Sequence, residues 1–205
     1  CTKITNAAII RNPVNMQDDS YLEFPSVNKT YNFALVGNLV TIHKGQDILL
    51  QVLANEEWKE KDWRLNIYGS GYDEQYLKSL VEIYALNNKV IFHGKVTDIR
   101  KIWSENHMLL MPSHMEGMPL AVVEAMLCGR PCLVTDVGGH VEWIDDGITG
   151  FVCYGNNVIA LNNTLQNAWQ QRGKWEEMGR DAHQKAVELY EKDAGKKLLD
   201  QIITY

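Results

Sequence analysis

The sequence lacks long apolar runs, and none approaches the roughly 18 consecutive apolar residues that a membrane-spanning helix requires. No stretch has the pattern of a signal peptide. Cysteine is scarce as well, with four residues that show no paired CxxC spacing: Cys1, Cys128, Cys132 and Cys153. We therefore expect reduced thiols without disulfide or metal roles, no transmembrane segment and a cytoplasmic location.

Basic residues are also fewer than acidic ones, with 20 Lys and Arg against 26 Asp and Glu. The net charge is -6 at pH 7, which argues against a general nucleic-acid-binding protein. It leaves room for a local basic pocket that takes one phosphorylated small molecule. With 45% apolar and 22% charged residues, the composition is typical of a globular protein.

Short apolar runs alternate with helix-length amphipathic stretches from residue 31 onward. The expected strands are 31–37, 64–69, 89–93, 107–111, 131–135 and 150–153. The expected helices between them are 46–58, 74–86, 97–104, 119–128 and 139–145. This alternation predicts an α/β fold, a Rossmann-like doubly wound parallel sheet of about six strands with helices on both faces.

The chain divides into three parts by pattern. Residues 1–30 show weak periodicity and are interpreted as a linker, and residues 31–155 form the sheet domain. Residues 156–205 hold three helical stretches, 158–171, 174–190 and 194–203, which we expect to pack on the sheet domain and on a domain missing from this chain. Because the chain starts at Cys1 without an initiator methionine, it is expected to be a fragment.

One stretch, residues 112–129, combines a strand end, a loop and a helix. Pro119 can open the helix without losing a needed N–H, which leaves the N–H groups of residues 120–122 free for an anion. Gly129 closes the helix. Glu116 and Glu124 flank this helix start with seven residues between them, so they could bracket a ligand.

The other strand ends carry further candidates, because ligands bind at the carboxyl ends of parallel strands. Lys44 follows the first strand and is well placed for phosphate, although a lone lysine here is more often solvated. Gly69 and Gly71 form half of a dinucleotide fingerprint, but the third glycine and the ribose-binding acid are absent. A nicotinamide-dependent dehydrogenase is therefore a poor interpretation.

Three features follow the third and fifth expected strands. His93 most simply reads as a hydrogen-bonded residue at a strand end, and Thr97 can cap the next helix. Gly138 and Gly139 make another glycine turn. A single such turn indicates backbone packing against backbone, whereas its recurrence at successive strand ends favours close approach of backbone to ligand.

Together these motifs resemble the retaining glycosyltransferases of family 4. The resemblance runs from about Asn12 to Gly155 and rests on these matches: Phe33–Leu39 with Lys44 and Gly45, Val90–Gly94, Pro112 and Ser113 with Glu116–Pro119, Glu124–Met126 with Gly129, and Gly138–Glu142 with Asp146–Gly150. It covers only the carboxyl-terminal, nucleotide-sugar-binding half of the two-domain GT-B fold. Residues 12–15 resemble the start of the interdomain linker.

The resemblance implies a role for each matching residue. Glu124 would accept hydrogen bonds from the ribose hydroxyls, Glu116 would contact the donor sugar, and Lys44 would neutralise the leaving diphosphate, so Glu116 and Lys44 are the catalytic candidates. Backbone N–H groups would bind the sugar and diphosphate, and a residue after the third strand would contact the base. The resulting nucleotide-sugar-binding set is Gly37, Asn38, Lys44, Gly94, Val96, Glu116, Gly117, Met118, Leu120 and Glu124.

The chain departs from the family pattern at Asn38, where an arginine usually joins the lysine on the diphosphate. Lys95 or another basic group then has to substitute, or donor binding is weaker. The chain has no DxD triplet, and the family resemblance implies no bound metal and no cofactor. A glycosidase pair of carboxylates is a poor interpretation, since one carboxylate is assigned to the ribose.

The function implied is donor binding in a retaining hexosyltransferase-type enzyme that moves a sugar from a UDP- or GDP-linked donor to a glycan or lipid acceptor. The acceptor would bind through the missing amino-terminal half, so the fragment is expected to be inactive alone, and peripheral membrane association of the longer protein stays open. Alternatives are another GT-B enzyme, such as a nucleotide-sugar epimerase or a phosphorylase, and a non-catalytic nucleotide-sugar-binding module.

Overall fold

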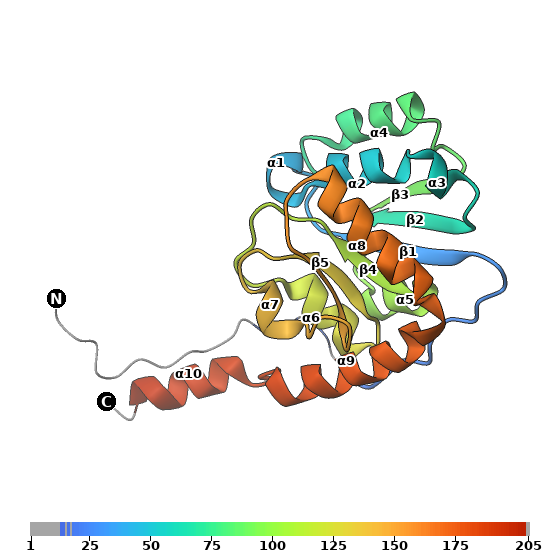
Figure 1. The fold of residues 1–205 in the computed structure, drawn as a ribbon. Helices are drawn as coiled ribbons and strands as arrows, with labels where there is room; N and C mark the ends of the chain where they lie inside the picture. The colour runs from blue at the N-terminus through green and yellow to red at the C-terminus, as the bar shows by residue number, and fades with distance from the viewer. Residues whose placement is uncertain (1–12, 15, 17, 204–205) are drawn as a thin grey trace.

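The computed structural model describes residues 13, 14, 16 and 18–203, without the side chain of residue 201. Six parallel strands form a single sheet in the order β3-β2-β1-β4-β5-β6 (Figure 1). The strands are β1 Tyr31–Val36, β2 Trp63–Tyr68, β3 Val90–Gly94, β4 Met108–Met111, β5 Cys132–Thr135 and β6 Gly150–Cys153. Every expected strand is confirmed, with bounds that differ by at most one residue.

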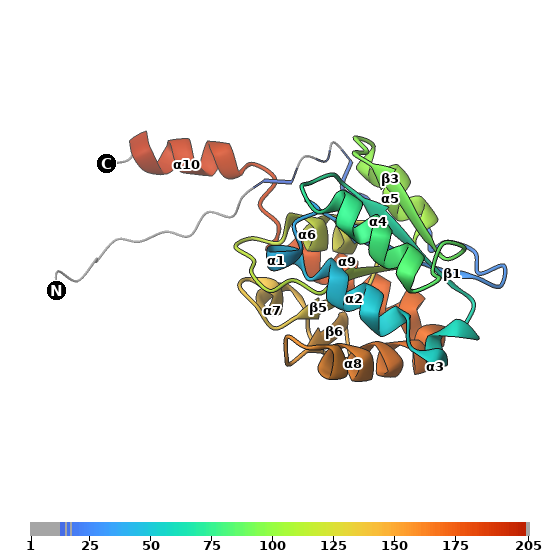
Figure 2. The same ribbon diagram turned by 90° about the horizontal axis from the view of Figure 1, so that it is seen from above.

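Alternation along the strands divides the core into two layers. Leu109 and Leu110 are neighbours in β4, yet they enter separate apolar clusters on opposite faces of the sheet. One face is covered by α2 Gln46–Leu53, α3 Glu56–Lys59, α4 Glu74–Ile83 and α8 Val158–Gln170. The other is covered by α5 Ile99–Glu105, α6 Leu120–Leu127 and α7 His140–Trp143 (Figure 2). The Rossmann-like, doubly wound fold is therefore confirmed.

Two expected helices differ from the observed ones by more than two residues at an end or by a break, and one observed helix was not expected. The helix expected over 46–58 divides into α2 and α3, because Asn55 is extended and starts a new helix. The helix expected over 74–86 ends earlier, since Ala85 adopts a left-handed conformation with φ 55°. A short helix that the pattern did not predict, α1 Thr41–Lys44, follows β1.

The carboxyl-terminal helices begin on one face of the sheet and end away from the domain. A 3-10 turn, η1 Arg172–Lys174, leads into α9 Trp175–Leu189. Trp175 enters one apolar cluster and Ala182 the other, so α9 crosses the edge of both layers. The last helix, α10 Ala194–Ile203, extends away from the body of the domain with at least half of each large apolar side chain exposed, except Leu198 at 49% (Figure 1).

Residues 18–30, part of the segment that the sequence pattern predicts to be a linker, lie against the sheet domain without strand or helix. Arg130 holds it there: the fully buried guanidinium donates to the carbonyls of Leu22 (3.1 Å), Glu23 (2.7 Å) and Trp103 (2.7 Å). Leu22 and Phe24 pack on opposite apolar clusters. Cys1 and Asn12, which carried earlier expectations, lie outside the described residues. Cys128, Cys132 and Cys153 are free and buried, as expected.

Gly179 allows α9 to contact the turn after α6. A Cβ there would lie 2.1 Å from the carbonyl oxygen of Gly129, whereas a Cβ at Gly195 in α10 would meet open space. We expect Gly179→Ala to lower the free energy of unfolding by about 1–3 kcal/mol in urea denaturation. The matched change Gly195→Ala should leave stability unchanged or raise it slightly, because alanine favours helix. Equal effects of the two changes would show that this contact is not tight.

Candidate functional site

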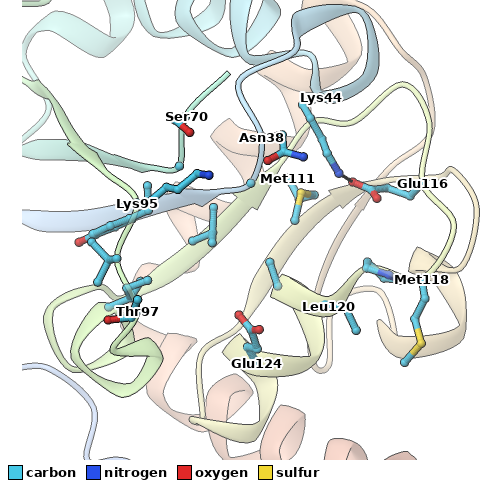
Figure 3. A pocket seen from close by; sticks show the side chains of 18 residues that line it. Asn38, Lys44, Ser70, Lys95, Thr97, Met111, Glu116, Met118, Leu120 and Glu124 are labelled. Atoms are coloured by element: carbon cyan, nitrogen blue, oxygen red, sulfur yellow. Dashed lines mark hydrogen bonds and ion pairs between the residues drawn. The ribbon is translucent and has the colours of Figure 1, made fainter. Parts of the chain in front are cut away.

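The sheet has its topological switch point between β1 and β4, since the chain proceeds outward in one direction from β1 and in the other from β4. In open parallel sheets this crevice is the usual ligand site. A cavity of about 510 Å³ opens there, at the carboxyl ends of the strands (Figure 3). Its lining comes from the ends of β1, β2, β3 and β4 and from α1, α5 and α6: Val36, Gly37, Asn38, Lys44, Tyr68, Gly69, Ser70, Lys95, Val96, Thr97, Ile102, Met111, Glu116, Met118, Pro119, Leu120, Ala121 and Glu124.

Lys44 is placed by the short helix α1. At the start of α1, Asp73 accepts hydrogen bonds from the backbone N–H (2.7 Å) and the hydroxyl (2.9 Å) of Thr41. At its end, Gly45 has φ 60°, and a Cβ there would lie 2.2 Å from the carbonyl oxygen of Pro112. The loops after β1, β2 and β4 are thereby fixed against one another, and Lys44 is directed into the cavity.

Glu116 is the centre of a hydrogen-bonded chain. Its carboxylate forms an ion pair with Lys44 and accepts a hydrogen bond from the hydroxyl of Ser113 (2.8 Å). The hydroxyl of Thr135 in turn donates to the carbonyl of Ser113 (2.5 Å). The side chain of Glu116 is only 8% exposed, so the pair is largely shielded from water. This chain joins the loops after β1, β4 and β5 and fixes the orientation of the carboxylate.

Glu124 differs from Glu116 in its surroundings. It points into the cavity from the first turns of α6, on the side opposite Lys44 (Figure 3). Burial alone raises the pKa of its carboxyl to about 7. A carboxyl group with this pKa changes charge near neutral pH, and hydroxyl donors from a ligand would stabilise its ionised form.

The start of α6 corrects one expectation. Pro119 precedes the helix as its cap residue, and the N–H of Leu120 donates to the carbonyl of Met118 (3.0 Å). The N–H of Val122 donates to the carbonyl of Pro119 (3.0 Å). The expectation that residues 120–122 all keep free N–H groups was therefore wrong at Leu120 and Val122, because the turn before the helix uses them.

All but two of the candidate binding residues line the cavity. Gly94 and Gly117 lie beside it rather than in its lining. The carbonyl of Gly94 accepts from Gly69 (2.7 Å), and the carbonyl of Gly117 accepts from Gly139 (3.2 Å). Both glycines have open space where a Cβ would stand. Their backbones connect neighbouring loops around the cavity.

The sequence did not single out the apolar floor of the cavity. Tyr68 and Met111 are the last residues of β2 and β4, and Ile102 comes from α5. The signal that could have found the first two is positional, since each is the final residue of a strand and ligands bind at the carboxyl ends of parallel strands. Ser70 and Thr97 add hydroxyl groups to the wall.

Two further expectations are corrected by the contacts. A Cβ at Gly69 would lie 1.9 Å from the carbonyl oxygen of Gly37, and one at Gly138 would lie 1.9 Å from that of Glu116. These glycines therefore permit loop backbone to approach loop backbone, and approach to a ligand was the wrong interpretation. The cap of α5 is Asp98, which accepts from the N–H of Lys101 (3.0 Å), and Thr97 is not the cap.

Two general findings bear on the site. Among the residues that the structure describes, no group of three or more His, Cys, Asp or Glu side chains is arranged to hold a metal ion. Within the same residues, no helix is both long and apolar enough to span a membrane. His93 is hydrogen-bonded to Asn66 (2.9 Å) and stacks on Tyr68, as its simplest interpretation predicted.

Comparison with known proteins agrees with the fold. An uncharacterized glycosyltransferase of Haemophilus influenzae is 32% identical over 157 residues, which cover 76% of this chain and 43% of that protein. The N-acetyl-alpha-D-glucosaminyl L-malate synthase of Bacillus anthracis is 31% identical over 147 residues, 71% of this chain and 37% of the synthase. TarM of S. aureus, solved as a mutant in complex with fondaparinux, alpha-GlcNAc-glycerol and UDP, has a TM-score of 0.82 at 22% identity over 97% of this chain and 40% of its own.

Fold and cavity place the chain in the class of doubly wound α/β domains with a polar site at the switch point. Residues 19–185 match the family described as glycosyl transferases group 1, and the chain belongs to that family. It spans less than half the length of the two curated relatives named above.

Proposed function

We propose that this chain is the donor-binding domain of a retaining glycosyltransferase of family 4. The substrate is a UDP- or GDP-linked sugar, and the acceptor is a glycan or a lipid. The observation that carries the proposal is the cavity at the switch point of a group 1 glycosyltransferase domain, which holds Lys44, Glu116 and Glu124 together. One cation and two carboxylates in different environments match the three chemical parts of a nucleotide sugar.

The assignment of parts follows from charge and burial. Lys44 carries the positive charge that a departing diphosphate needs. Glu116 is held by Lys44 and Ser113 beside the same phosphate position, where an oriented carboxylate can accept from sugar hydroxyls. Glu124 points into the cavity from α6, where two carboxylate oxygens can accept from both hydroxyls of a ribose. Val96 and the neighbouring loop backbone contact the base, and Gly37, Asn38, Gly94, Gly117, Met118 and Leu120 surround the phosphates and the sugar.

The proposal includes the parts of the reaction that this chain does not hold. Residues 1–30 link it to an amino-terminal domain, residues 31–155 bind the donor, and residues 156–205 pack on this domain and contact the other one through the apolar face of α10. The acceptor and any general base come from that other domain, so this chain alone binds donor without transferring the sugar. The reaction uses no metal ion or cofactor and takes place in the cytoplasm.

Isothermal titration calorimetry of this chain with UDP, GDP and ADP and with their sugars tests the proposal. We expect saturable binding of at least one nucleoside diphosphate and its sugar. Absence of binding to all of them at millimolar concentration would contradict it. Product analysis of a longer protein that includes the amino-terminal domain separates sugar transfer from epimerisation and phosphorolysis, and absence of any turnover there would favour a binding module.

Glu116→Gln tests the role of the sugar-facing carboxylate. We expect the variant to lose the preference for the nucleotide sugar over the bare nucleotide, with about a tenfold loss for the sugar-linked form and a smaller one for the nucleotide. Glutamine keeps the shape and can still accept from Ser113. Calorimetry with both ligands measures the ratio, and equal losses for both would exclude a selective contact between Glu116 and the sugar.

A further inference from the structure

The cavity has a charge deficit if it takes a nucleoside diphosphate. Its lining includes two lysines, Lys44 and Lys95, and two carboxylates, Glu116 and Glu124, with no arginine. Lys44 is already paired with Glu116. A diphosphate brings about two further negative charges, and Asn38 stands at the cavity wall without a charge to offer. A second cation is therefore needed, and Lys95 is the remaining one in this lining.

The backbone places Lys95 on the far side of the cavity from Lys44. Gly94 ends β3 with φ 68°, and its carbonyl accepts a hydrogen bond from the N–H of Gly69 (2.7 Å). This bond holds the turn after β3 against the end of β2, one strand closer to the switch point. In Figure 3 the amine of Lys95 points across the cavity toward Asn38, and Lys44 approaches from the other side.

Lys95 is also available for a ligand. Lys44 is held by an ion pair, whereas no salt bridge or hydrogen bond joins the amine of Lys95 to another side chain among residues 18–203. Its side chain is exposed at the cavity rim, where a mobile cation can move toward an incoming anion. The neighbouring Val96 and Thr97 line the same wall.

We propose that Lys95 binds the α-phosphate of the donor and supplies the second positive charge that the neutral side chain of Asn38 cannot. The inference rests on the proposed function. Lys44 lies with Glu116 at the sugar side, so it meets the phosphate next to the sugar. Lys95 lies with Val96 at the base side, so it meets the phosphate next to the nucleoside. The diphosphate is thus held from opposite walls of the cavity by two lysines of different loops.

Because Lys95 and Lys44 are assigned to different phosphates, their removal should affect the nucleoside monophosphate and diphosphate differently. Lys95→Ala should weaken the binding of both about tenfold, because both carry the α-phosphate. Lys44→Ala should weaken the diphosphate far more than the monophosphate. The matched control is Lys101→Ala, which removes an exposed lysine of α5 that is outside the cavity lining and should change neither affinity.

The test is calorimetry with UMP, UDP, GMP and GDP on the unaltered chain and on these variants, with far-UV circular dichroism to confirm that each is folded. Adding Asn38→Arg to the Lys95→Ala variant should restore most of the diphosphate affinity, because it returns a second cation to the cavity, at the position toward which the amine of Lys95 points. Unchanged affinities in Lys95→Ala, or a loss matched by Lys101→Ala, would overturn the inference. Failure of the unaltered chain to bind either diphosphate would instead contradict the proposed function itself.

Discussion

Lys44→Ala is expected to reduce affinity for the preferred nucleoside diphosphate by about 10- to 150-fold, the value of a charge-assisted hydrogen bond. The amine of Lys44 is directed into the cavity by α1 and has no nearby replacement on the same wall. The change also leaves Glu116, with its side chain 8% exposed, without its cation. We therefore expect a loss of about 1–3 kcal/mol in the free energy of unfolding.

Two variants separate binding from stability at this position. Lys44→Arg keeps the charge and should retain most of the diphosphate affinity. Lys44→Met combined with Glu116→Gln removes both charges, so it should recover stability without recovering affinity. Calorimetry and urea denaturation measure the two quantities. Diphosphate affinity that survives the loss of both charges would show that the ion pair is structural and that the phosphate binds elsewhere.

The second large effect is a pH dependence that originates at Glu124. Burial raises the pKa of its carboxyl to about 7. In the proposed function the ionised form accepts hydrogen bonds from both ribose hydroxyls. Affinity for a nucleotide sugar should therefore rise about tenfold from pH 6 to pH 8, with proton release on binding. A sugar-linked diphosphate is the right ligand, because its phosphates do not titrate in this range. Burial lowers the pKa of His140, which faces Glu116 and Lys44.

Glu124→Gln should bind more weakly at pH 8, by about tenfold or more, and should lose the pH dependence. Its effect on stability has the opposite sign. Between pH 4.5 and about 7 the folded protein keeps a proton on Glu124 that the unfolded chain releases, so Glu124 makes the unfolding free energy fall as pH rises. The variant should therefore be more stable at pH 8, by about 1–3 kcal/mol. If Glu124→Gln lowers both the affinity for the nucleotide sugar and the free energy of unfolding at pH 8, burial does not raise the pKa of Glu124 as described.

The strands could be predicted closely because each is a short apolar run ended by glycine, proline or polar residues. Leu109 and Leu110 are both buried, on opposite faces, so no alternation was needed to recognise β4 as a central strand. The ends of the helices could be predicted less closely than the strands. Alanine rarely adopts the left-handed conformation of Ala85, so the pattern gave no sign of it. Asparagine is common at helix starts, but Asn55 lies inside a helix-length stretch, so the division there was not predicted. The four residues of α1 are too few to show a period.

The site could be located from the sequence through the strand ends, but its contacts could not. Lys44, Glu116 and Glu124 were predicted as candidates, and the structure places all three at one cavity. The pairing of Lys44 with Glu116 spans 72 positions and follows from the fold, not from spacing. The close loop contacts at Gly69 and Gly138 were misread for the same reason, since a sequence shows where backbone must come close but not what it approaches.

A crystal structure of this chain with the nucleoside diphosphate that it binds more tightly, UDP or GDP, tests the central claim most directly. The account predicts the nucleotide at the switch point between β1 and β4. Both ribose hydroxyls should lie within hydrogen-bonding distance of Glu124, and the diphosphate should lie between Lys44 and Lys95. A nucleotide bound away from this cavity, or one whose ribose does not contact Glu124, would contradict the account.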